Sequence, residues 1–303
     1  MKQQGILAAA ALAGLAVAGC GQPNVVLPKT VKLAMAYKAG TTQSYKFTMT
    51  MKGSLGTATG ATPLNSTVTA TETLKALSVD PDGTVTFQVV VSDISGTTNG
   101  QPIPESARKT GSTTTIKMAR DGSVVLINAP AAVVGGGATD AAQSGMNQIT
   151  PFLPGYAVKP GDTWTKAVDQ ANPLGTGRIV YTASNRYLRD QKLRGHTDAV
   201  IESKATIPVD VTTDLTKILA ASGASNPAAA AAFKGVSAIQ KGTTITDNTA
   251  YLDQAAGRLD RSHIVMNLNL NQTLVGAPAG SKLNSSGPTT YKADMTIDLD
   301  SLS

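Results

Sequence analysis

Long stretches of this chain alternate between apolar and polar residues, and this period of two constrains the fold more than any other feature. Residues 84–91 (TVTFQVVV) place four apolar side chains on one face: Val85, Phe87, Val89 and Val91. Successive side chains of a strand point to opposite faces, so the pattern is typical of a half-buried β-strand. The 39 threonines add β-branched residues, which pack well on a pleated surface. The sequence therefore predicts a mostly β protein.

Turn motifs separate the predicted strands. Residues 80–83 (DPDG) combine a proline, which presets φ, with a glycine that accepts positive φ. Residues 120–122 (RDG) divide two more alternating runs, which predicts a hairpin. Besides 84–91, strands are predicted at 44–52, 66–78, 113–119, 123–128, 177–188, 197–209, 242–252, 258–270 and 289–299.

Helix signals are few. Asn226 and Pro227 supply an N-cap and a proline at the first helical position before 228–234, and Gly235 follows. Residues 214–221 add a turn or two, and 139–149 form a weaker candidate. We therefore expect one or two short helices, near 139–149 and 214–234.

A faint internal repeat indicates two similar β units. Gly40 aligns with Gly161, and the turn glycines Gly83 and Gly122 align with Gly195 and Gly257. The interval from Gly195 to Gly257 is longer than that from Gly83 to Gly122, because it contains the predicted helical insert near 212–234. The predicted units are 36–150 and 151–303, and repeated β units that pack on one another fit antiparallel sheets. Their half-barrel or incomplete-barrel form is what the architectural resemblance given below implies.

The first nineteen residues predict a signal peptide. Lys2 precedes an apolar run at 6–18, which is shorter than the roughly 20 residues of a membrane-spanning helix. The run ends in Val17-Ala18-Gly19-Cys20, which resembles the lipobox of bacterial lipoproteins, and Cys20 is the only cysteine of the chain. The resemblance implies cleavage before Cys20, a diacylglycerol thioether on its sulfur and, in many bacteria, a fatty acid such as palmitate on its amino group. An ordinary secretory signal with an incidental cysteine is the alternative.

Such an anchor predicts where the protein resides and what it contacts. Two or three acyl chains hold a protein firmly to a bilayer, whereas one holds it marginally. We expect a tether over 20–35 and a domain at the cell membrane or outer membrane, facing the periplasm or the exterior. Cleavage before Cys20 removes Lys2 and leaves 25 basic and 20 acidic side chains. This positive excess favours contact of the domain with anionic lipid headgroups. Scattered basic residues and few aromatics argue against nucleic-acid binding.

A second resemblance covers roughly 150–270. A group of bacterial envelope lipoproteins of unknown function is similar to this chain at 160–164 (PGDTW), at Tyr187-Leu188, and at 251–253 (YLD) with 257–259 (GRL). These are strand-start and turn motifs, so they imply a fold and no catalytic residue. Long antiparallel strands with helices over a concave face are also similar in architecture to half-barrel lipoprotein carriers, although architecture does not determine function.

Few residues are candidates for chemistry. His196 beside Asp198 does not complete a metal site, which needs three or more ligands. His263 follows Ser262, but neighbours on a strand point to opposite faces, which predicts a surface histidine. Trp164, the only tryptophan, is predicted to anchor the start of a strand. We expect no metal, no cofactor and no catalytic residue, and Cys20 as the one modified position.

The favoured function is that of a non-enzymatic, lipid-anchored envelope protein whose β domain binds a hydrophobic ligand or a protein partner. A purely structural surface module is the alternative, and a hydrolase using His196 or His263 is a more distant one. A carrier needs an apolar concavity of a few hundred Å³, whereas a structural module has a filled core.

Overall fold

The structure is a computed structural model that describes residues 29–57, 60–108, 113–128, 149–172, 175–217, 233–277 and 287–302. Its long strands are β2 (Thr42–Thr57), β3 (Gly60–Val79), β4 (Val85–Thr98), β6 (Thr113–Met118), β7 (Val124–Asn128), β9 (Thr163–Ala171), β10 (Gly175–Leu193), β11 (His196–Asp214), β12 (Ser237–Asp253), β13 (Arg258–Val275) and β14 (Thr289–Ser301). The short elements are β1 (Val31–Lys32), β5 (Gln101–Pro102), β8 (Ala157–Val158) and α1 (Glu105–Arg108).

In the described part of the chain, twelve strands form one sheet in the order β7-β6-β4-β3-β2-β14-β13-β12-β11-β10-β9, with β5 beside β4. Neighbouring strands are antiparallel, and the sheet is not closed into a barrel. The predicted fold class, mostly β with antiparallel strands in an open half-barrel, is confirmed. Most strands are longer than predicted, because backbone pairing continues into Thr-, Gly- and Asn-rich ends that carry no apolar alternation.

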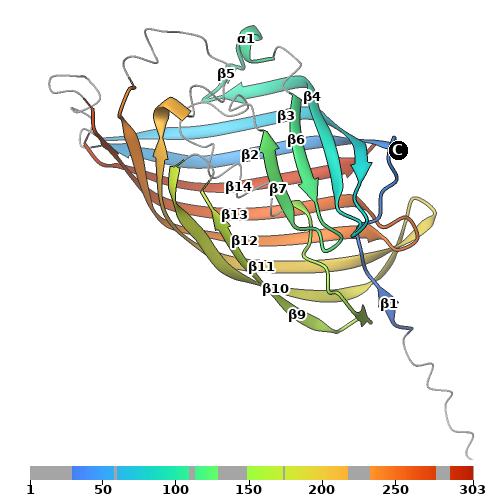
Figure 1. The fold of residues 1–303 in the computed structure, drawn as a ribbon. Helices are drawn as coiled ribbons and strands as arrows, with labels where there is room; N and C mark the ends of the chain where they lie inside the picture. Colours follow the sequence, from blue (N-terminus) through green and yellow to red (C-terminus); the bar gives the residue numbers. More distant parts are fainter. Residues whose placement is uncertain are drawn as a thin grey trace, which may run out of the picture.

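The sheet curls so strongly that strands near its two edges share one hydrophobic core (Figure 1). Phe87 and Ile116 from one half belong to the same buried cluster as Trp164 and Ile201 from the other. Lys166 on β9 also forms an ion pair of 2.6 Å with Asp121 in the turn between β6 and β7. One end of the half-barrel is therefore filled by side chains from both halves.

The segment that leads into β2 is part of this filled end. Its strand β1 pairs with β8, and Leu33 and Met35 are buried in the shared core. The backbone N–H of Met35 donates to Arg120 O, and that of Ala36 donates to Gly257 O. Residues 31–35, which fall within the stretch expected to be a tether, are therefore packed into the fold.

The two sequence units meet in the middle of the sheet. Strand β14, at the end of the second unit, pairs with β2, at the start of the first, from Thr290 opposite Gly56 to Ser301 opposite Tyr45. The aligned turn glycines Gly83 and Gly195 both have positive φ, at 86° and 91°, and each joins two strands of a hairpin. The predicted turns at 80–83 and 120–122 are confirmed.

The described residues contain little helix. Ile149 and residues 215–217, at the edges of the predicted helices, are helical, whereas 139–148 and 218–232 lie outside the described residues. Helix α1 was not predicted, since its four residues are too few to show a helical period. No helix in the described ranges is long and apolar enough to span a membrane.

The prediction that Trp164 anchors a strand start is confirmed. The residue lies at the beginning of β9, is 8% exposed and belongs to the shared core. Its indole Nε1–H donates to the carbonyl oxygen of Phe152 at 2.7 Å. A buried indole whose polar group is satisfied is a structural anchor and no exposed ligand platform.

Candidate functional site

Two hairpin ends bring a histidine and three aspartates together. His196 is the first residue of β11, and Asp198 lies two residues further on the same side of the strand. Asp253 is the last residue of β12 and is paired directly with Asp198 across the two strands. Asp260 comes from β13, on the far side of β12. We call these four residues the histidine–aspartate cluster.

A β-bulge positions Asp260. Leu259 is opposite Leu252 and Arg261 is opposite Tyr251, so Asp260 is an extra residue without a partner across the strand pair. A bulge re-aims side chains, and here both Leu259 and Asp260 are buried although they are neighbours in sequence. Without the bulge, strict alternation would direct the two side chains to opposite faces.

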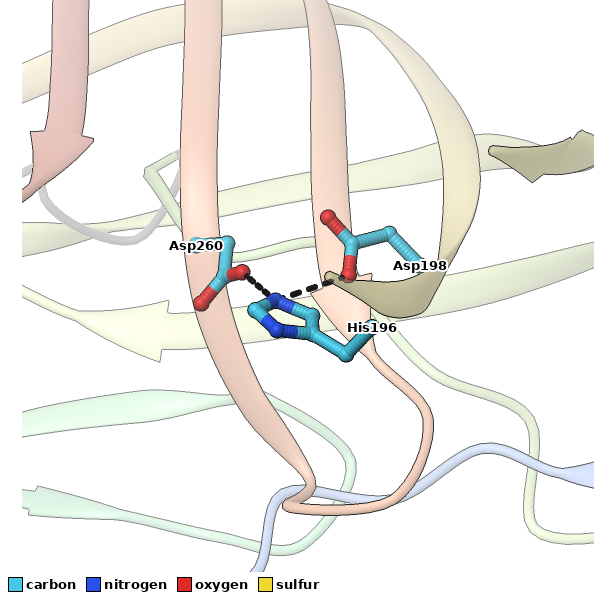
Figure 2. Close-up of side chains that lie close together, drawn as sticks. All are labelled: His196, Asp198 and Asp260. Atoms are coloured by element: carbon cyan, nitrogen blue, oxygen red, sulfur yellow. Dashed lines mark hydrogen bonds and ion pairs between the residues drawn. The ribbon is translucent and has the colours of Figure 1, made fainter. Parts of the chain in front are cut away.

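The imidazole of His196 lies between two carboxylates (Figure 2). Its Nε2 is hydrogen-bonded to Asp260 Oδ2 and lies 3.4 Å from Asp198 Oδ1 and 4.0 Å from Asp253 Oδ2. The imidazole is 27% exposed, whereas the Asp198 side chain is 0% exposed. The cluster is thus buried on its aspartate side and reachable through the histidine.

The carboxylates have unequal partners. Asp253 Oδ1 accepts hydrogen bonds from the backbone N–H groups of Ala255 and Ala256, at 2.9 and 3.0 Å. Both carboxylate oxygens of Asp198 are buried without a hydrogen-bond partner. A buried charge without hydrogen bonds is costly, so Asp198 is the unusual group of the cluster.

The electrostatics follow from this arrangement. Burial raises the pKa of Asp198 to about 6, and the neighbouring charges of Asp260 and Asp253 act in the same direction. The hydrogen bond to Asp260 raises the pKa of His196 above its usual value. The cluster therefore favours any positive charge placed within it.

The second histidine has a different environment. His263 is 45% exposed, and its Nδ1 lies 2.7 Å from Asp298 Oδ1. Ser262 is buried on the other face of β13, where its hydroxyl lies 2.9 Å from the oxygens of Ile149 and Asn248. The predicted opposite orientation of Ser262 and His263 is confirmed. These two residues do not form a nucleophile and base pair, because such a pair must be within hydrogen-bond reach.

A methionine-rich apolar face lines the middle of the sheet. It combines alternate residues of β2, β13 and β14: Met49, Met51, Ile264, Met266, Leu268, Leu270, Ala293, Met295 and Ile297. We call these nine residues the methionine face. Among the described hydrophobic side chains that pack against it, Ile149 is the one that comes from outside the strands.

A shallow depression of about 310 Å³ lies on β2, β13 and β14. Most of its lining is polar, with Lys52, Asn267, Asn269, Lys292 and Asp294 among its residues. An apolar ligand needs a mostly apolar site, which this depression does not provide. The nine side chains of the methionine face are apolar, and each of them is 9% exposed or less.

Glu72 on β3 is a further titratable group. It is partly buried opposite Tyr45, and burial raises its pKa to about 7. A carboxyl whose pKa rises on folding contributes stability below its unfolded pKa, near 4.5, and loses that contribution as pH rises through about 7.

We therefore predict that Glu72→Gln becomes progressively more stable than the parent between pH 5 and pH 8.5. The difference is expected to reach up to about 3 kcal/mol, and less if water screens the carboxylate. Urea unfolding of both proteins across this pH range measures it. A stability difference that does not change with pH would show that Glu72 titrates normally.

The candidate residues identified from the sequence thus lie in three different places. The structure adds two aspartates to the histidine–aspartate cluster. Cys20 lies outside the described residues. His196 and Asp198 are in the cluster, and His263 is apart from it. Asp253 and Asp260 were not singled out from sequence, because only the β11–β12 register and the bulge bring them to His196.

Comparison with known proteins gives little further information. No family model matches the chain, and no curated protein matches it. One solved structure with some similarity is a domain from Vibrio parahaemolyticus named for outer membrane lipoprotein sorting, at 9% identity over 86% of this chain and 83% of that one. Its TM-score is 0.12, which is too low to support a conclusion about fold or function.

Proposed function

We propose that this chain is a non-enzymatic, lipid-anchored protein of the bacterial envelope that binds an acyl-chain ligand on the methionine face. The anchor rests on the lipobox-like residues 17–20 and on Cys20 being the sole cysteine. The ligand class rests on the apolar composition and the length of the methionine face; because its side chains are buried, an acyl chain would replace contacts that now cover them. A hydrolase using His263 is disfavoured because Ser262, its neighbour in sequence, is on the opposite face of β13.

The observation that carries the ligand proposal is the methionine content of the face. Met49, Met51, Met266 and Met295 lie together on three neighbouring strands. Methionine is unbranched and polarizable, so it adapts to irregular apolar surfaces and is common at sites that accept varied hydrophobic partners. The filled end of the half-barrel has two methionines, Met35 and Met118, and adds rigid aromatic residues such as Trp164, Tyr187 and Phe87.

The dimensions of the face suit an extended chain molecule. Along β13 the buried apolar residues run from Ile264 to Leu270 at every second position. Strands rise about 3.4 Å per residue, so the stripe is about 20 Å long. Because the proposed anchor would hold the domain at a membrane, acyl chains would be the most abundant apolar ligands within its reach.

We predict that Met266→Gln weakens acyl-chain binding by at least about tenfold. Glutamine has nearly the length of methionine, but it would place an amide without a partner against the acyl chain, which costs about 1–3 kcal/mol. Because Met266 is 1% exposed in the chain itself, the melting temperature of the variant is measured together with its binding. The test is a titration with cis-parinaric acid, a fluorescent fatty acid, using the full chain carrying Cys20→Ser after detergent removal.

Val265→Gln is the matched control. Val265 is the next residue of β13, lies on the opposite face and is 46% exposed, so this variant is expected to bind like the parent. Equal binding by parent and Met266→Gln would place the ligand elsewhere. No binding by the parent would leave the chain as a structural module.

A further inference from the structure

The histidine–aspartate cluster has more buried negative charge than its neighbours neutralise. Arg258 Nε lies 4.0 Å from Asp253 Oδ2, and backbone amides bind the other oxygen of Asp253. Asp198 and Asp260 form ion pairs with the single imidazole of His196, and the charge of Arg194 acts on Asp198 from outside the cluster. A buried carboxylate pair beside one imidazole is costly unless a proton or a further positive charge compensates it.

The environment of Asp198 indicates which kind of positive charge compensates the aspartates. Its side chain is completely buried, and its two oxygens have no hydrogen-bond partner. Its Oδ1 forms an ion pair with His196 Nε2 at 3.4 Å without a hydrogen bond, so the carboxylate points into the space shared with the imidazole. Buried polar atoms are almost always paired, and carboxylates that are not paired with side chains commonly coordinate a metal ion.

The geometry points to a site for a divalent transition-metal ion bound by His196, Asp198 and Asp260. One nitrogen and two oxygens, one from each residue, lie within 4.8 Å of one another. Two ligand atoms on a tetrahedral zinc ion are separated by about 3.3 Å, which is close to the distance of 3.4 Å between His196 and Asp198. The imidazole favours zinc over calcium or magnesium, which prefer sites built only from oxygen ligands.

Binding would replace the proton shared by His196 and Asp260. The Nε2 proton would pass to solvent, and the nitrogen lone pair would coordinate the ion. Because His196 belongs to β11 and Asp260 to β13, the ion would join two hairpins across β12. An ion that binds the folded chain alone stabilises it, so the site would act as a clamp at this end of the sheet.

Zinc titration of the full chain tests the site. The protein carries Cys20→Ser to remove the sole thiol and is dialysed against EDTA. Isothermal calorimetry is expected to show one zinc ion per chain, and zinc is expected to raise the melting temperature. Absence of zinc binding, or a response to calcium in its place, would overturn the proposal.

Three variants localise the ion. His196→Ala and Asp198→Asn are expected to weaken zinc binding by about tenfold or more. His263→Ala alters the only other histidine, which has a single aspartate beside it, and is expected to bind like the parent. Zinc binding that survives in His196→Ala, or disappears in His263→Ala, would refute the assignment.

Asp198→Asn keeps the test valid if His196→Ala fails to fold. The asparagine has nearly the same shape and removes an unpaired buried charge, so without zinc this variant is expected to melt no lower than the parent. At the same zinc concentration, the parent is expected to gain more stability than the variant. Equal gains in both proteins would contradict the site.

Discussion

Trp164→Ala is expected to lower the free energy of unfolding by about 3–5 kcal/mol. The indole belongs to the core that joins the two halves of the sheet, and its N–H donates to Phe152. Its removal leaves a cavity and an unpaired carbonyl at the same place. Domains of this kind have a total stability of about 5–15 kcal/mol, so the loss is a large part of the whole.

Urea unfolding followed by circular dichroism measures this change. Tyr156→Ala is a suitable control. Tyr156 lies in the segment that leads from Phe152 to β9, directly before β8, and is 57% exposed. The control is expected to change stability by less than about 0.5 kcal/mol. In the parent, the buried indole should emit at short wavelength and resist iodide quenching. A freely quenched indole, or a small effect of Trp164→Ala, would show that this residue does not hold the core.

Cys20→Ser is expected to abolish lipid attachment. A serine has no thiol to form the thioether, so the protein should leave the membrane fraction or accumulate as an unprocessed precursor. Without acyl chains, the domain would lose about 0.8 kcal/mol of membrane binding for each CH₂ that they bury. Growth of a bacterial host with radioactive palmitate, followed by fractionation, measures both effects.

Gly19→Ala provides the control for the cysteine variant. It keeps a small residue before Cys20 and is expected to be labelled and processed like the parent. Labelling that persists in Cys20→Ser would show that the acyl group is attached elsewhere or that the chain is not a lipoprotein.

The features that the sequence could predict are those set by neighbouring residues. Alternation at 84–91 identified the buried side of β4, since Val85, Phe87 and Val89 are all in the core. Glycines after aspartate or arginine marked the tight turns. The period of two placed the side chains of Ser262 and His263 on opposite faces of their strand. These signals are local because strand geometry and turn chemistry depend on adjacent residues.

The features that the sequence could not predict depend on distant pairing. The junction of β14 with β2 unites the end of the described chain with its beginning, and no local pattern specifies that pair. The burial of Leu33 and Met35 depends on the turns at Arg120 and Gly257, which come much later in the chain.

The candidate metal site was missed for the same kind of reason. His196 and Asp198 were visible as an i, i+2 pair, but Asp260 reaches them through a bulge and across an intervening strand. A bulge adds one residue and changes which face a side chain occupies, and alternation alone places such a residue wrongly.

The central claim, that the half-barrel holds an acyl-chain ligand, is tested most directly by native mass spectrometry of the full chain purified from bacterial membranes in mild detergent. We predict one non-covalent lipid-derived molecule per chain, in addition to the lipid that we propose on Cys20, and its loss in Met266→Gln but not in Val265→Gln. A chain that carries its covalent lipid and no bound apolar molecule, in parent and variants alike, would contradict the claim.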